Sequence, residues 1–234
     1  MTTFIGIDQS LTGTGACILD CEGRVVDTLL VKPKKLKGVE RLDFIVRRIV
    51  RFTEQVSGAV FSCREEYSFS SKGRSVFNLG ELGGCIDLAL YNLDRPQWTS
   101  HAHYRIPPAT HKKFCVLDGA ATKGSVKKDK LAYLAKIAEH TGEEFDDDNV
   151  ADSFMLAKTL WGFWQCLESE AYFDALLRER RESLVPPKMR KKMKITPSKV
   201  QRMGHEAFSE LIRKGFAQTY LVFERASAGE IDES

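Results

Sequence analysis

Short apolar runs alternate with polar turns along the first half of the chain. Runs of this kind, rich in β-branched residues and bounded by turn residues, predict β-strands. Five strands are predicted, at 4–8, 15–20, 24–31, 59–63 and 103–106. The turn from Asp20 to Gly23 should join the second and third strands as a hairpin.

Longer segments repeat their apolar residues at the spacing of an amphipathic helix. Leu42, Ile45 and Ile49, for example, recur at intervals of three and four residues. Helices are predicted at 39–56, 74–91, 127–141 and 148–167, with a short one at 110–116. Without the short helix the order is βββαβαβαα, which predicts an α/β fold whose mixed five-stranded sheet is flanked by helices.

The predicted helix at 74–91 contains three glycines, Gly80, Gly83 and Gly84. Each glycine costs a helix roughly 1 kcal/mol relative to alanine. We interpret them as a place where a second backbone packs closely, and we expect that backbone to come from a second copy in a homodimer.

The pattern changes after the predicted helix at 148–167. An amphipathic charged helix is expected at about 168–182 and another near 203–217, with a basic stretch between them. The sequence therefore predicts a main domain at 1–167 and a helical and basic C-terminal extension at 168–234.

The composition is that of an ordinary globular protein, with 234 residues, 43% hydrophobic and 29% charged. No apolar run approaches the roughly 20 residues that span a bilayer, and the N-terminus lacks the basic region of a signal peptide. The six cysteines form no Cys-x-x-Cys pair, so we expect reduced thiols and no zinc site. We expect a cytoplasmic protein with no membrane partner.

The net charge is only +3, but the charges are clustered. Basic residues gather at 32–37, 123–130 and 188–202, and acidic residues gather at 143–148. Basic patches beside carboxylates suit a protein that binds a polyanion and performs metal chemistry on it. The alternative is that each patch is simply a solvated surface.

The first predicted strand ends in a single carboxylate, Asp8, followed by a turn rich in small and hydroxyl residues up to Gly15. An unpaired buried carboxylate is costly, so Asp8 should have a partner. It could bind a metal ion or face a phosphate, and the strand alone does not decide between these roles.

Further acids follow at the ends of other elements. Glu65 and Glu66 come directly after the strand at 59–63, and Asp148 and Asp152 share one face of the helix at 148–167. Converging carboxylates repel unless cations neutralise them, and oxygen ligands of this kind select Mg²⁺ or Mn²⁺. Two such ions about 4 Å apart can cleave a phosphodiester. Alternatively, acids at a helix start only favour the helix dipole.

Three segments resemble the RuvC family of Holliday-junction resolvases in order and separation. They are Gly6-Ile-Asp-Gln-Ser-Leu-Thr-Gly-Thr-Gly15, the stretch from Glu65 through Asn78-Leu-Gly80, and Asp148-Asn-Val-Ala-Asp-Ser153. The resemblance covers about residues 4–167. It implies a ribonuclease-H-like fold, a homodimer, two Mg²⁺ ions per site (Mn²⁺ can substitute) and cleavage of four-way or branched DNA.

The resemblance also implies roles for individual residues. Asp8, Glu65 (rather than Glu66) and Asp152 would be catalytic metal ligands. Family members often carry an acid or histidine three residues before the last aspartate, where this chain has Asn149. Either Asp148 takes that catalytic and metal-binding place, or Asn149 binds metal through its carbonyl oxygen.

DNA contacts are expected around this site. A lysine near the scissile phosphate could stabilise charge in the transition state, a role that the resemblance gives to Lys123. Aromatic residues after the catalytic glutamate could stack on an opened base. The candidates for DNA binding are Tyr67, Phe69, Lys72, Arg74, Lys112, Lys123 and Lys127. Alternatively the lysines are ordinary surface residues, and one of the two aromatic residues points into the core.

Two other function classes share some of these features. A sugar-kinase or actin-like ATPase also begins with a strand and an aspartate, but it needs a second phosphate turn and a longer chain; only Leu117-Asp-Gly-Ala120 resembles such a turn. A non-catalytic junction-binding protein would not need intact acids. The sequence thus favours a Mg²⁺-dependent endonuclease that resolves junctions by paired nicks, in the cytoplasm of a bacterium or a phage-infected cell. The compact size suits a phage-type member of the family.

Overall fold

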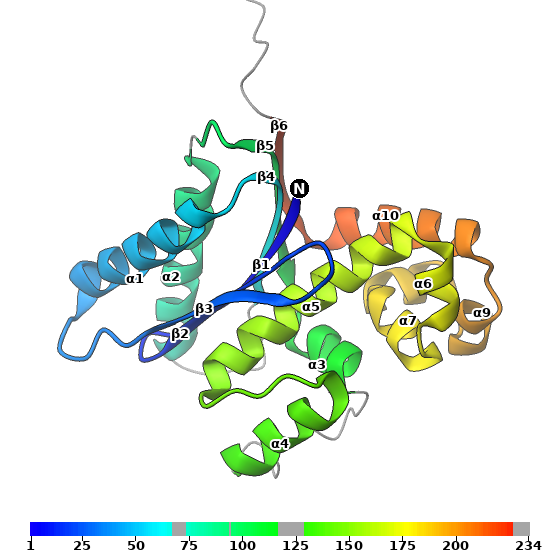
Figure 1. The fold of residues 1–234 in the computed structure, drawn as a ribbon, viewed down its shortest axis with the longest axis horizontal. Coiled ribbons are helices and arrows are strands. Elements are labelled where there is room, and N and C mark those ends of the chain that lie inside the picture. Colours follow the sequence, from blue (N-terminus) through cyan, green and yellow to red (C-terminus); the bar gives the residue numbers. More distant parts are fainter. Residues whose placement is uncertain (67–73, 94, 117–128, 227–234) are drawn as a thin grey trace, which may run out of the picture.

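The computed structural model describes residues 1–66, 74–93, 95–116 and 129–226 (Figure 1). The strands are β1 (Thr2–Asp8), β2 (Thr14–Leu19), β3 (Val25–Val31), β4 (Gly58–Glu65), β5 (Trp98–Ile106) and β6 (Leu221–Ala226). They form one six-stranded sheet in the order β3-β2-β1-β4-β5-β6. β1, β4 and β5 are parallel, while β2, β3 and β6 are antiparallel to their neighbours. The mixed sheet is therefore confirmed.

Helices cover both faces of this sheet. They are α1 (Gly38–Phe52), the short 3₁₀ helix η1 (Thr53–Gln55), α2 (Arg74–Tyr91), α3 (Pro108–Val116), α4 (Lys130–Thr141), α5 (Asp148–Glu168), α6 (Glu170–Ala175), α7 (Arg178–Leu184), α8 (Pro187–Lys192), α9 (Pro197–Gln201) and α10 (His205–Tyr220). α1 and α2 lie on one face, and α5 and α10 lie on the other (Figure 1). None of the described helices is long and apolar enough to cross a membrane.

The alternation of side chains along β1 explains why both faces are covered. Phe4 points into the core beneath α5 and α10, while Ile5 and Ile7 point into the core beneath α1 and α2. All three side chains are almost completely buried. A strand that is apolar on both faces belongs in the centre of a sheet, which is where β1 lies.

The prediction of five strands was wrong by one strand. β6 follows α10 and pairs antiparallel with β5 through residues such as Phe223, opposite His103. Its apolar run is short and begins directly after α10, only a few residues past the helix predicted near 203–217, so the sequence pattern did not separate the two elements. Pairing with the open edge of β5 decides its conformation.

The predicted helix at 168–182 is also divided, into α6 and α7. No proline or glycine lies at the break; instead Leu176 is extended and its side chain is buried in the core. Tertiary packing therefore ends α6.

The segment after α5 shares one hydrophobic core with the sheet, and Phe216 of α10 stacks on Phe163 of α5 with ring centroids 4.1 Å apart. The division into domains at 1–167 and 168–234 stays a prediction.

Two glycines allow α5 to lie directly on the sheet. A Cβ at Gly6 of β1 would collide with the backbone oxygen of Ser153 and the backbone nitrogen of Ala157. A Cβ at Gly15 of β2 would collide with the backbone of Asn149. The backbone of α5 thus approaches two neighbouring strands more closely than any side chain would permit.

A buried network of hydrogen bonds connects α2 to the face of the sheet opposite α5. Arg64 of β4 and His103 of β5 both donate to the Asp87 carboxylate of α2. Burial alone would raise the pKa of Asp87, but these hydrogen bonds outweigh it and hold the pKa well below its usual range. His101 and His103 also share the Ser62 hydroxyl.

We expect Gly6→Ala to lower the free energy of unfolding by about 1–3 kcal/mol or more, because the new methyl group has no space against α5. Urea denaturation of the variant and the wild type measures this. Gly204→Ala, just before α10, is the control, since a Cβ there meets nothing within 4 Å. It should change the free energy of unfolding by less than about 1 kcal/mol. If Gly6→Ala has the same free energy of unfolding as wild type, the close approach of α5 to β1 is contradicted.

The buried histidines should make stability fall in mild acid. Burial, together with the charges of His103 and Arg225, lowers the pKa of His101 to about 3. The unfolded chain takes up a proton near pH 6.5 that the folded ring resists, so stability is lost as pH falls from about 6.5. His101→Phe should reduce this loss between about pH 6.5 and pH 4 by up to 1.4 kcal/mol per pH unit. Urea denaturation at a series of pH values measures this loss in both proteins. If wild type and His101→Phe lose the same free energy of unfolding per pH unit, the assignment to His101 is refuted.

Candidate active site

Neighbouring parallel strands bring the first two carboxylates together. In the β1–β4 ladder Ile7 lies opposite Arg64, so the residues that follow them, Asp8 and Glu65, leave the sheet side by side. Because β1 and β4 are parallel, both acids lie at the carboxyl edge of the sheet. The sequence had placed each of them at a strand end.

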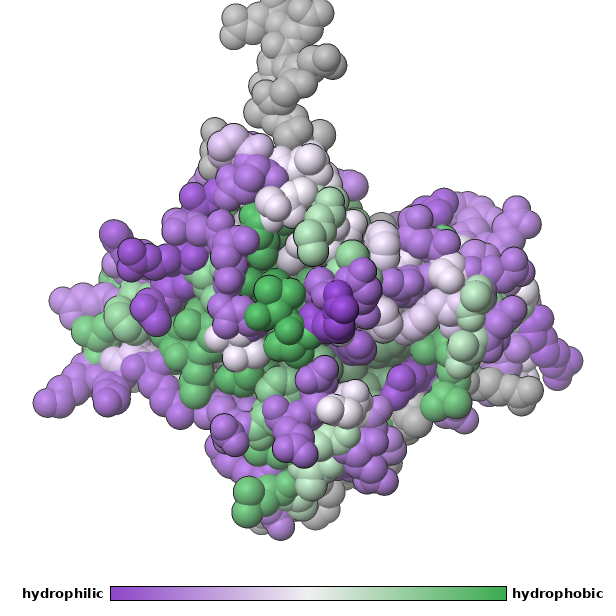
Figure 2. Space-filling model, viewed as in Figure 1, coloured by the Kyte–Doolittle hydropathy of each residue, from purple (hydrophilic) through white to green (hydrophobic). Residues whose placement is uncertain are grey.

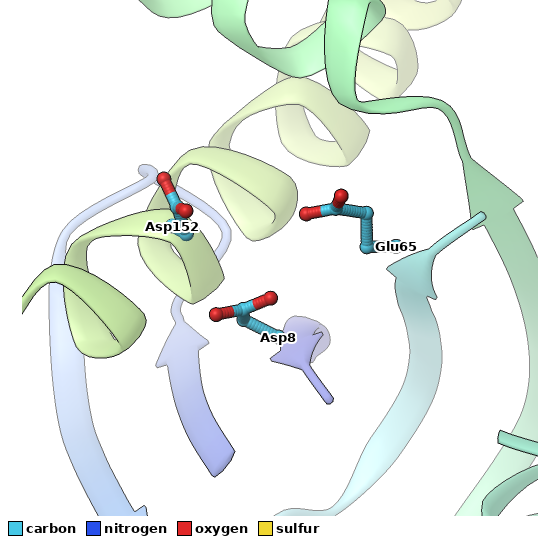
Figure 3. A group of neighbouring side chains, drawn as sticks. All are labelled: Asp8, Glu65 and Asp152. Carbon is cyan, nitrogen blue, oxygen red and sulfur yellow. The ribbon is translucent and has the colours of Figure 1, made fainter. Parts of the chain in front are cut away.

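The third carboxylate comes from α5. Asp152 lies one residue before Ser153, on the segment of α5 whose backbone packs directly against Gly6 and Gly15. Carboxylate oxygens of Asp8, Glu65 and Asp152 lie within 4.8 Å of one another (Figure 3). Asp152 is buried and Glu65 is half-buried. No other group of three acidic, histidine or cysteine side chains converges in this way within the part of the chain that the structure describes.

Polar neighbours hold Asp152 in place. The Tyr133 hydroxyl of α4 donates a hydrogen bond to Asp152 Oδ1, and Lys112 Nζ of α3 lies 3.7 Å from Asp152 Oδ2. Burial and the Asp152 charge raise the pKa of Tyr133 well above its usual value, so the phenol stays a donor. These contacts orient Asp152 and offset part of the repulsion among the acids.

The donor set fits a divalent metal ion. Three carboxylates that meet within 4.8 Å offer the hard oxygen ligands that Mg²⁺ and Mn²⁺ bind. A cation between them would relieve their mutual repulsion. The arrangement therefore favours the metal role over the phosphate-facing role that Asp8 alone left open.

The two candidates for a fourth ligand, Asp148 and Asn149, each have a hydrogen-bond partner outside the group of three acids. Asp148 Oδ1 accepts a hydrogen bond from Lys130 Nζ at 2.7 Å. The Asn149 side chain donates to Asp147 Oδ1 at 2.8 Å and faces Gly13. Asp147, not Asp148, caps α5, and its carboxylate accepts hydrogen bonds from both the backbone and the side chain of Asn149. A metal-binding role for Asp148 or Asn149 stays a prediction.

Among the predicted DNA-binding residues, Lys112 is the one whose side chain the structure describes. Only 6% of Lys112 is exposed, so the alternative of an ordinary surface lysine was wrong. Arg74 begins α2, and its side chain is not described. The remaining predicted positions lie outside the described residues, namely Tyr67, Phe69, Lys72, Lys123 and Lys127, together with the possible phosphate turn at 117–120.

One residue at the site escaped the sequence analysis. His111 of α3 is completely buried, and its Nε2 lies 3.6 Å from Glu65 Oε2. The topology could have indicated it, because β5 runs parallel to β4 and delivers the start of α3 to the same edge of the sheet.

Comparisons with known proteins agree with this architecture. No protein-family model matches the chain, and no curated protein matches its sequence. Among solved structures it is similar to RuvC of Thermus thermophilus, with a TM-score of 0.51 and 18% identity over 74% of this chain and 95% of that one. It is also similar to T. thermophilus RuvC in complex with a Holliday junction substrate, with a TM-score of 0.52 and 15% identity over 75% of this chain and 96% of that one. The chain therefore has the ribonuclease-H-like fold of RuvC.

Proposed function

We propose that the protein is a divalent-metal-dependent endodeoxyribonuclease that resolves Holliday junctions and related branched DNA by paired nicks. The observation that carries this proposal is the convergence of Asp8, Glu65 and Asp152 at the carboxyl edge of a RuvC-like sheet. A RuvC structure of this fold contains a Holliday junction substrate.

The chemistry follows from the residues at the site. Asp8, Glu65 and Asp152 would hold Mg²⁺ or Mn²⁺, and two bound ions would supply an activated water and a stabilised leaving oxygen. Tyr133 keeps Asp152 oriented through its hydrogen bond. Lys112 places a buried positive charge at the same site, where it can counter the charge of the reacting phosphate.

Basic surface would bind the DNA backbone. Lys188, Lys191 and Lys192 of α8 are exposed, and Lys194 and Lys199 follow them. Such a cluster suits contacts to phosphates. We also retain Tyr67, Phe69, Lys72, Arg74, Lys123 and Lys127 as proposed DNA contacts, with Lys123 as a proposed catalytic residue.

A homodimer would supply the second nick, because two cuts related by symmetry need two sites on a two-fold axis. The proposed interface is the groove between α1 and α2, which is lined by Leu42, Gly80 and Gly84 among others. Its lining includes large apolar side chains that are exposed, such as Val39 and Leu88. Figure 2 shows hydrophobic surface among hydrophilic residues on this side of the molecule.

Metal binding should stabilise the folded protein, because it removes repulsion among the three carboxylates. We expect Mg²⁺ at about ten times its dissociation constant to add about 1.4 kcal/mol, which raises the melting temperature by about 3–5 °C. Thermal unfolding with MgCl₂, against NaCl of equal ionic strength, measures this. Asp8→Asn should show little of the rise; an equal rise in that variant would place the ion elsewhere.

Asp8→Asn should also separate cleavage from binding. We expect the variant to bind a synthetic four-way junction within a few-fold of wild type but to cleave it at least about 100-fold more slowly. A panel of four-way, three-way, flap and linear DNA measures both properties. The control is Glu210→Gln on α10, an acid-to-amide change at an exposed position.

The same panel distinguishes the competing functions. Binding of junctions without cleavage by the wild-type protein would indicate a non-catalytic junction-binding protein. ATP hydrolysis without cleavage would indicate the kinase- or actin-like alternative. Retained cleavage by Asp8→Asn in Mg²⁺ would refute the metal role of Asp8.

A further inference from the structure

His111 differs from the other buried histidines of β5 and α3. His103 uses both ring nitrogens, toward Ser62 and Asp87, and the Nε2 of His101 also bonds to Ser62. His111 is equally buried, yet neither of its ring nitrogens has a hydrogen-bond partner. Buried polar groups are almost always hydrogen-bonded, so an imidazole without a partner indicates a ligand that binds there.

The ring is directed at the acidic site. Its Nε2 lies 3.6 Å from Glu65 Oε2, which is too far for a hydrogen bond. Two ligands about 2.1 Å from one ion and at right angles to each other stand about 3 Å apart, and wider angles separate them further. The observed separation therefore suits two atoms that bind the same ion.

The fold holds His111 in this position. The backbone amide of Glu66 donates to the Ile106 carbonyl at 2.9 Å, which ties the end of β4 to the end of β5. α3 begins two residues later at Pro108, and its next residue after His111, Lys112, reaches Asp152. His111 and Lys112 thus lie beside different members of the group of three carboxylates, His111 beside Glu65 and Lys112 beside Asp152.

We propose that His111 Nε2 and Glu65 bind one divalent ion together. The nitrogen ligand makes this ion position prefer Mn²⁺ to Mg²⁺. Imidazole binds transition metals well, whereas Mg²⁺ prefers oxygen ligands. The inference rests on the proposed function, because it adds a ligand to the metal centre of that function. It supplies a nitrogen ligand from α3, a different element from the one that carries Asp148 and Asn149.

Electron spin echo envelope modulation of the protein loaded with MnCl₂ tests the proposal directly. The wild type should show the ¹⁴N modulation of a coordinated imidazole, and His111→Gln should lose it. His140→Leu on α4 is the control and should keep it. Calorimetry should show that His111→Gln weakens Mn²⁺ binding at least about tenfold and changes Mg²⁺ binding by less than about threefold.

The outcomes separate this proposal from the proposed function. Mn²⁺ that binds the wild type and not Asp8→Asn, but without ¹⁴N modulation, would overturn the role of His111 and leave the metal-dependent function standing. Absence of Mn²⁺ binding to the wild type would overturn both. If His111→Gln fails to fold, the wild-type spectrum together with that of His111→Asn decides the matter.

Discussion

The close approach of α5 to β1 and β2 is the constraint on which the candidate site depends. Gly6 and Gly15 leave no room for a side chain beneath the α5 backbone. Asp8 ends β1 and Asp152 lies on the segment of α5 that Gly6 admits, so the packing distance between helix and strand also sets the distance between the two carboxylates. A larger residue at either glycine would move α5 outward and open the site. Local packing and the geometry of the site are thus one feature of the fold.

The surrounding polar groups explain how an acidic cluster can exist in a folded protein. Lys112 and Tyr133 contact Asp152, and His111 lies beside Glu65. These neighbours come from α3 and α4, the elements between β5 and α5 in the chain. Lys112 and Tyr133 orient Asp152 before any ion binds, and a metal centre benefits from preorganisation of this kind. The remaining repulsion among the acids favours a bound cation.

The sequence predicted the parts of this account that depend on local pattern. The runs that became β1 to β4, the helix at 74–91 and the acids at the ends of β1 and β4 were predicted correctly, because strand period and strand-end acids are local signals. Of β5 only the end, at 103–106, was predicted. β6 and the break at Leu176 were missed, since pairing with β5 and burial in the core decide them. His111 was missed for the same reason: it joins Glu65 only through the parallel pairing of β4 and β5.

The central claim is that Asp8, Glu65 and Asp152 together form a metal centre. Anomalous diffraction from crystals of the protein soaked in MnCl₂ tests it most directly, because the signal locates Mn²⁺ without reference to activity. We expect anomalous peaks within about 2.0–2.3 Å of oxygens from these three carboxylates. Peaks confined to surface acids such as those at 143–148, with none among the three carboxylates, would contradict the account.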